Sequence, residues 1–141
     1  MFTNPCDPLL RTTERTTTLP WGEQMDFDRY TITLLVLRQD GPEFTRDEED
    51  VLQDAHMSHL ADLHEAGYLL AAGPLFDGSS PLRGLAILNV GVDDARKLKE
   101  RDPAVRAGKY RVIALPWMVP GRAISFSQTQ FPRSVAEAIG R

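Results

Sequence analysis

The chain has 141 residues, of which 42% are hydrophobic and 26% charged, with a formal net charge of −4. These values are ordinary for a single folded domain with a core of its own, and they argue against disorder. The net negative charge gives no support to a nucleic-acid or anionic-membrane partner, and no apolar run approaches the ~20 residues needed to cross a bilayer. Cys6 is the only cysteine, so no internal disulfide is possible. The first residues lack a secretion signal, and we expect a cytoplasmic protein.

The two ends of the chain carry little periodicity. Residues 1–28 contain prolines, a glycine and a threonine-rich patch, which predict an irregular N-terminal arm that lies over the domain or a partner chain; a disordered terminus is the alternative. Trp21 favours docking, because its indole is a large apolar surface. Residues 29–126 form the predicted domain. Residues 127–141 form a C-terminal tail with only weak signals, after a possible short strand over 123–126.

Between the ends, the pattern alternates strands and helices. The β-branched and aromatic residues of 29–37 predict a first strand. Thr45 and Glu48 have capping-box spacing, and Gly67 has the position of a glycine that ends a helix, so a long helix lies between them. The remaining predicted elements are strands over 68–75, 85–90 and 110–118, and a helix over 94–101 capped by Asp93 and ended by Pro103.

This order, β-α-β-β-α-β, predicts a ferredoxin-like α+β fold with a four-stranded antiparallel sheet. Two helices cover only one face of such a sheet. Several of the predicted strands nevertheless carry apolar residues on both faces. An uncovered apolar face marks an interaction surface, and the simplest way to cover it is a second copy of the chain. The sequence therefore predicts a homodimer.

Two histidines occupy the apolar stripe of the long helix. Helical periodicity places His56 and His59 in the stripe, whereas His64 points away from it. His56 lies one turn before His59, so both can face one cavity. The pair does not make a zinc site, because zinc needs further N, S or O ligands that no nearby motif supplies. No phosphate-binding loop, dinucleotide fingerprint or nucleophile elbow occurs either, and we expect no metal and no cofactor.

Three segments resemble the YCII-related (YciI-like) family, in the dimeric α/β-barrel group of ferredoxin-like folds. They are DAHMSHLADLHEAGYLLAAGPL at 54–75, GLAILNV at 84–90 and DPAVRAGKY at 102–110. The resemblance implies a dimer with a pocket between sheet and helices. It also implies a His–Asp pair at the active site, which maps onto His59 and Asp102. Relatives include a dehydrochlorinase that acts on a chlorinated hydroxyquinol, and the wider group includes muconolactone isomerase.

The chemistry of such a pair is general acid–base catalysis. A carboxylate bonded to one ring nitrogen fixes the imidazole tautomer, and the other nitrogen is left free to move a proton. The alternative from the residues alone is that His59 is a core histidine bonded to a backbone carbonyl and that Asp102 is a helix-end residue. His56, Ser79 and Ser80 are the candidate substrate-binding residues, although the serines also suit a polar turn.

We therefore expect a small cofactor-independent enzyme. Its reaction would be elimination or isomerisation of a small oxygenated organic substrate, with His59 as acid–base and Asp102 orienting it. A non-catalytic ligand-binding module, or a dimeric structural module, is the alternative hypothesis.

Overall fold

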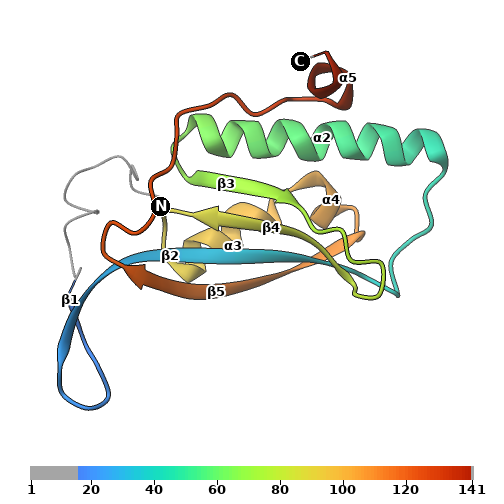
Figure 1. Ribbon diagram of the computed structural model, residues 1–141. Helices are drawn as coiled ribbons and strands as arrows, with labels where there is room; N and C mark the ends of the chain where they lie inside the picture. Colours follow the sequence, from blue (N-terminus) through green and yellow to red (C-terminus); the bar gives the residue numbers. More distant parts are fainter. Residues whose placement is uncertain (1–15, 141) are drawn as a thin grey trace.

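The computed structural model describes residues 16–140. Its elements follow the expected ferredoxin-like order, with a hairpin added before the first long strand (Figure 1). The strands are β1 (Thr16–Thr18), β2 (Gln24–Leu37), β3 (Leu69–Pro74), β4 (Leu82–Leu88) and β5 (Tyr110–Pro120), and the helices are α2 (Arg46–Glu65), α3 (Val92–Glu100), α4 (Pro103–Arg106) and α5 (Val135–Ile139). The α+β ferredoxin-like fold predicted from the sequence is confirmed.

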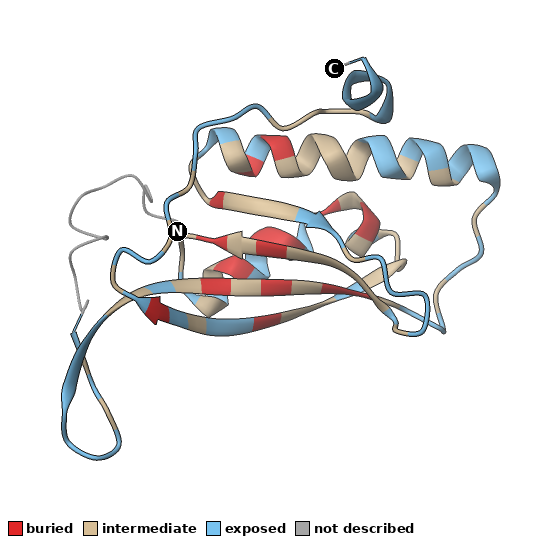
Figure 2. Ribbon diagram, in the orientation of Figure 1, coloured by how far each residue is buried: buried red, intermediate tan, exposed pale blue. Residues whose placement is uncertain are grey.

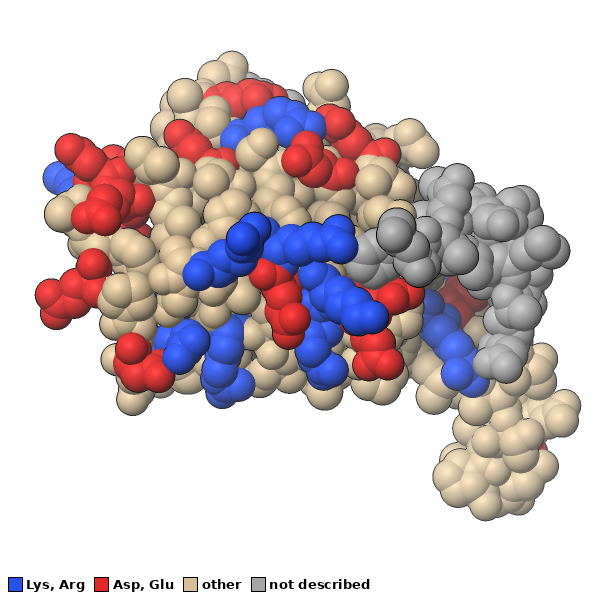
Figure 3. Space-filling view, turned by 180° about the vertical axis from the view of Figure 1, so that it is seen from behind, with Lys and Arg blue, Asp and Glu red and all other residues tan. Residues whose placement is uncertain are grey.

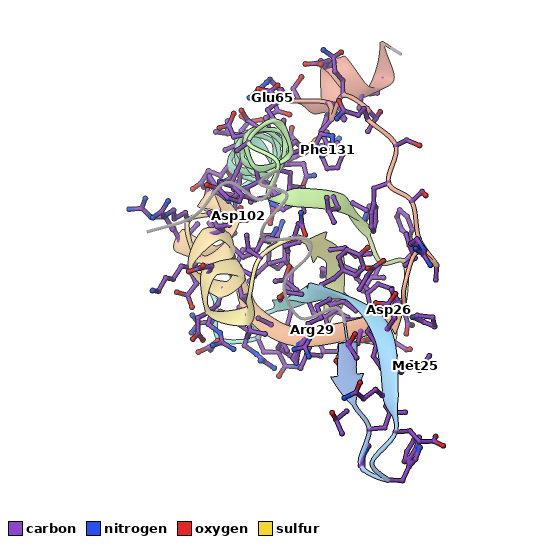
Figure 4. All side chains as sticks on the ribbon, turned by 90° about the vertical axis from the view of Figure 1, so that its left-hand side faces the viewer. Met25, Asp26, Arg29, Glu65, Asp102 and Phe131 are labelled. Atoms are coloured by element: carbon purple, nitrogen blue, oxygen red, sulfur yellow. The ribbon has the colours of Figure 1, made fainter. Side chains whose placement is uncertain are left out.

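The main sheet is antiparallel, with the strand order β5-β2-β4-β3. Among the strands that the structure describes, β5 pairs only with β2, so it is an edge strand of this sheet. That position accommodates Pro116, which has no amide hydrogen to donate to a further strand. The long helices α2 and α3 lie on the same face of the sheet (Figure 4).

Alternation along β2 separates the two faces of the sheet. Thr31, Thr33 and Leu35 are buried beneath the helices, whereas the intervening residues from Tyr30 to Leu34 are half-buried on the opposite face. Figure 2 shows buried residues on the central strands and on the helices that cover them. The hydrophobic core consists of apolar side chains from α2, β3, β4 and α3, namely Leu63, Leu69, Ala86, Leu88, Ala95 and Leu98.

Helix α2 has the ends that its sequence predicts. The Thr45 hydroxyl accepts from the Glu48 amide at 3.2 Å, and the Glu48 carboxylate accepts from the Thr45 amide at 3.1 Å, which completes a capping box. Gly67 follows the helix with φ +87°, in the left-handed region that glycine occupies without strain. The capping box and Gly67 fix where the helix begins and ends, and they thereby fix the positions of its histidines.

The N-terminal arm differs from its prediction. Residues 1–15 lie outside the part that the structure describes, but Thr16–Thr18 pairs with residues 24–26 in an antiparallel hairpin that projects from the domain (Figure 1). β2 runs without a break through the predicted boundary between residues 28 and 29. The prediction of an irregular arm is therefore wrong for residues 16–28. Pairing with β1 and β5 organises a stretch whose sequence shows no period of its own.

The chain around α3 and α4 also departs from expectation. α3 begins after Gly91 without a side-chain cap, so Asp93 is not its N-cap. Asp102 does not simply end a helix, because it caps the next one: its Oδ1 accepts from the Ala104 amide at 2.9 Å, and Pro103 occupies the first turn of α4. The outer side of these helices exposes basic residues interspersed with acidic ones (Figure 3).

After β5 the chain crosses back to α2. The predicted strand over 123–126 does not form. The segment instead runs along α2 to α5 (Figure 1), and Arg133 pairs with Asp62 at 2.8 Å and with Glu65 at 3.0 Å. No helix within residues 16–140 has the length and apolar character that a membrane crossing requires.

Candidate active site

A cavity of about 340 Å³ lies between α2 and the helix-covered face of the sheet. Its walls are mostly apolar, and its polar side chains come from different elements. The lining residues are Thr33, Leu35, Gln53, His56, Met57, Leu60, Ala72, Gly73, Pro74, Arg83, Gly84, Leu85, Ala86, Lys99, Tyr110, Phe131 and Pro132. This volume falls in the range of small-molecule sites.

A histidine and an aspartate meet at this cavity. His56 Nδ1 lies 2.5 Å from Asp102 Oδ2, and the carboxylate is fully buried whereas the imidazole retains 14% exposure. Figure 4 shows Asp102 between α2 and α3. Because Asp102 is the N-cap of α4, its backbone position is fixed by that helix start, and Oδ2 is left to receive the ring of His56. His56 also lines the cavity.

The carboxylate of Asp102 is held in its charged form. Burial alone would raise its pKa, but the hydrogen bond and charge of His56, the charge of Lys99 and the Ala104 amide together lower the pKa below its ordinary value. A charged carboxylate accepts a hydrogen bond from the Nδ1–H of His56, so Nε2 lies on the other side of the ring.

His59 has a different partner. Its Nε2 donates to the backbone carbonyl of Leu98 at 3.1 Å, and its side chain is absent from the lining of the cavity. Burial lowers its pKa, more than the charge of Asp102 raises it. The prediction of a direct His59–Asp102 pair is therefore wrong: the aspartate contacts His56, one turn earlier. The placement of His59 matches the alternative of a core histidine bonded to a carbonyl.

The two serines lie away from the cavity, in the turn between β3 and β4. Ser79 Oγ donates to Asp77 Oδ1 at 2.6 Å, and Ser80 Oγ accepts from the Leu82 amide at 3.1 Å. The turn uses both hydroxyls, so the structure does not bring Ser79 and Ser80 to the cavity as substrate-binding residues. Arg83, on the adjoining strand, does line the cavity.

Two buried polar residues of the cavity, Lys99 and Thr33, were not predicted. Lys99 points inward from α3 with 1% exposure, and its Nζ is 4.0 Å from Asp102 Oδ2. Thr33 is also 1% exposed, and its hydroxyl is the buried side-chain polar atom without a hydrogen-bond partner in residues 16–140. Helical spacing places Lys99 next to Leu98 on the inward side, but a lysine in that pattern is more often solvated, so the sequence gives no clear signal.

The C-terminal segment supplies a further wall. The ring of Phe131 stacks on His64 at 4.1 Å between centroids. His64 Nδ1 lies 2.7 Å from the Leu69 carbonyl oxygen, and Nε2 lies 3.0 Å from the Thr129 carbonyl oxygen. His64 is thus not a solvated residue but the anchor of this segment. The sequence of residues 127–141 did not indicate this packing, because the contacts of the segment are made with α2 and not within the segment itself.

Within residues 16–140, no group of three or more His, Cys, Asp or Glu side chains lies in an arrangement that could hold a metal ion. The described residues therefore add no third side chain of this kind to the His56–Asp102 pair.

Comparison with known proteins identifies the family. The chain is similar to 5-chloro-2-hydroxyhydroquinone dehydrochlorinase (TftG) from Burkholderia phenoliruptrix AC1100, solved in complex with 2,5-dihydroxybenzoquinone, with 18% sequence identity, a TM-score of 0.47, and coverage of 62% of this chain and 92% of that one. No curated protein sequence matches the chain. Residues 32–117, more than half of the chain, match the model of the YCII-related domain. The protein therefore belongs to the YCII-related family.

Proposed function

We propose that the protein is a small-molecule enzyme in which His56 is the general acid–base residue and Asp102 its positioning residue. The observation that supports this most is the 2.5 Å contact between His56 Nδ1 and the buried Asp102 carboxylate, at the wall of a cavity. The carboxylate fixes the tautomer that carries the proton on Nδ1, and Nε2 is then a base that faces a bound molecule.

The proposed reaction moves one proton in two steps. Neutral His56 accepts a proton from an acidic C–H of the substrate at Nε2, and Asp102 stabilises the resulting imidazolium. The electron pair left on the substrate forms a new double bond. In an isomerisation the same nitrogen returns the proton to another carbon. In an elimination the bond to a leaving group on the neighbouring carbon breaks, the leaving group takes the electron pair of that bond, and the imidazolium then gives its proton to the leaving group or to water. Neither reaction transfers electrons to or from a redox cofactor, so we propose that the protein uses none.

The cavity restricts the substrate to a compact organic molecule. Leu35, Met57, Leu60 and Ala86 provide apolar walls, and the volume of about 340 Å³ holds a single ring with its substituents. A carbonyl group on the ring would make the neighbouring C–H acidic, because the electron pair left behind delocalises onto the carbonyl oxygen. Small oxygenated ring compounds are therefore the proposed substrate class.

Deuterium exchange tests this proposal without knowledge of the natural substrate. Enolisable cyclic ketones and unsaturated lactones are incubated with the protein in D₂O, and incorporation at the acidic carbon is followed by NMR. We expect wild type to accelerate exchange and His56→Gln to lose roughly 10²–10⁴-fold of that acceleration, the usual contribution of a general base. His59→Gln is the matched control, since its amide can still donate to the Leu98 carbonyl.

Two results contradict the proposal. If His56→Gln retains full exchange activity, His56 is not the base; if His59→Gln alone abolishes it, the role belongs to the residue first suggested by the family resemblance. Binding of these compounds without any exchange in wild type would assign the cavity to a ligand-binding module instead.

We propose further that the protein is a homodimer that buries the face of the sheet opposite the helices. That face carries half-buried or exposed apolar side chains from three strands, namely Tyr30, Ile32, Leu34, Leu85, Ile87, Ile113, Leu115 and Trp117. Leu115 alone is 47% exposed. An apolar face of this kind is suited to a second identical face. Light scattering at micromolar concentration should give the mass of a dimer, and Leu115→Arg should give a monomer; a wild-type monomer would overturn the proposal.

A further inference from the structure

Lys99 has an incomplete set of partners. Its ammonium carries three donors, is 1% exposed and lines the cavity. Its ion-pair partner is Asp102 Oδ2 at 4.0 Å, and that oxygen already receives His56 at 2.5 Å. The other oxygen of the same carboxylate receives the Ala104 amide. Both oxygens of Asp102 are therefore already bonded to other groups, and among residues 16–140 Lys99 is paired at long range only.

Thr33 lines the same cavity from the sheet, and no protein group satisfies its buried hydroxyl among residues 16–140. Its neighbour on the same face, Thr31, shows the usual arrangement: Oγ1 donates to the Val90 carbonyl at 2.6 Å. The strands beside Thr33 place Ala86 and Ala114 opposite it. These small side chains leave the hydroxyl without a neighbouring acceptor. A buried, unpaired hydroxyl normally costs stability and calls for a ligand or a functional reason.

The charge of Lys99 also favours an anion beside these two donor groups. Burial lowers the pKa of Lys99, and the distant Asp102 carboxylate opposes that effect only in part. A second negative charge in the cavity would stabilise the ammonium and accept a hydrogen bond from it. It would also accept from the hydroxyl of Thr33.

We propose that Lys99 and Thr33 bind one anionic oxygen of the substrate, which makes the substrate a small organic acid, a carboxylate or an ionised phenol. This inference rests on the proposed function and names the substrate class for the same cavity. The anionic oxygen lies against α3 and β2, the hydrocarbon part packs against the apolar walls, and the reacting carbon faces His56 on α2. Lys99 and Thr33 are thus specificity-determining residues, separate from the acid–base pair.

The test compares benzoate with benzamide, which have nearly the same shape and differ in charge. Affinities are measured by two-dimensional NMR titration of wild type and single variants. We expect wild type to bind benzoate about tenfold or more tightly than benzamide, because hydrogen bonds to a charged oxygen are stronger. Lys99→Met should remove that preference, while leaving benzamide affinity within about twofold.

Lys97→Met is the matched control, since Lys97 lies on the exposed side of the same helix. It should bind both probes like wild type. Thr33→Val provides a second variant of the site with the same shape as the original residue, and it should weaken benzoate binding several-fold. The inference is overturned if benzoate does not bind wild type at millimolar concentration, or if Lys99→Met binds benzoate as tightly as Lys97→Met does.

Failure of this inference is distinguishable from failure of the proposed function. Exchange catalysed through His56 on a neutral ketone does not need an anion site, so a wild type that exchanges ketones but binds benzoate no more tightly than benzamide would refute the anion site alone. An intact benzoate preference together with no exchange in wild type would leave an anion-binding pocket and remove the catalytic role.

Discussion

His56 Nδ1 and Asp102 Oδ2 lie 2.5 Å apart although 46 positions separate the residues in the chain. The contact joins the middle of α2 to the N-cap residue of α4. It depends on two local features that the sequence encodes separately: the length of α2 and the capping of α4 by Asp102. Any change to this pair should alter both the imidazole and the packing between the two helices.

Asp102→Asn should disconnect the pair while preserving the cap of α4, because Asn caps a helix about as well as Asp. With Oδ1 still capping α4, the asparagine turns its NH2 group toward His56, and this group donates and cannot accept. The tautomer of His56, read from its imidazole ¹⁵N chemical shifts, should therefore change. The variant should lose roughly 3 kcal/mol of unfolding free energy at pH 7, because the buried Lys99 ammonium loses its carboxylate partner. Unchanged imidazole ¹⁵N shifts of His56 would contradict the pairing.

Asp102 should also make the stability of the protein depend on pH in the acidic range. The pKa of Asp102 is lowered in the folded state, so its stabilisation is present above the ordinary value of 3.8 and is lost as the pH falls through the lower folded value. Urea unfolding of wild type and Asp102→Asn should therefore converge as the pH is lowered from 7 towards about 3. If the unfolding free energies of the two proteins instead differed by a constant amount over this pH range, Asp102 would not be the source of the acid sensitivity.

His59→Gln should weaken the dependence of stability on pH near neutrality. Burial lowers the pKa of His59 below its ordinary 6.5, so the unfolded chain binds a proton more readily than the folded one. Wild type should lose stability as the pH falls below about 6.5, and the variant should lose less of it. Thermal unfolding between pH 7.5 and 5.5 measures the difference; equal slopes in the two proteins would contradict the buried position of this imidazole.

Thr33→Val and Thr31→Val should have opposite effects on stability. The first removes a buried hydroxyl without a partner and should raise the unfolding free energy by roughly 1–2 kcal/mol. The second leaves the Val90 carbonyl without its donor and should lower the unfolding free energy by about 1 kcal/mol. Urea denaturation of the two variants checks the signs. Destabilisation by Thr33→Val would show that its hydroxyl already has a partner.

Phe131→Ala should weaken the cavity wall formed by the C-terminal segment. The ring stacks on His64 and packs against the core cluster, so its loss should cost about 1–2 kcal/mol of stability. Binding of an aromatic ligand such as benzoate should fall as well. Phe76→Ala is the control, because that ring is 94% exposed and should affect neither quantity. Unchanged benzoate binding in Phe131→Ala would place the ligand away from this wall.

The sequence by itself determined the order of the elements and the ends of the long helix. Thr45, Glu48 and Gly67 act through neighbouring backbone groups, so their effects can be recognised from local spacing. Periodicity also put His56 and His59 on the inward side of α2, which narrowed the candidate site to one helix face. The family resemblance added Asp102, which no spacing rule connects to residues 46 positions away.

Only the tertiary structure decided which histidine meets the aspartate. One turn of α2 separates His56 from His59, and the position of α4 along that helix selects the first as the partner of Asp102 and leaves the second to the Leu98 carbonyl. The inward lysine and the unpaired threonine of the cavity likewise depend on how α3 and β2 face one another. Such relationships come from the packing of distant elements, whereas local sequence encodes only the elements themselves.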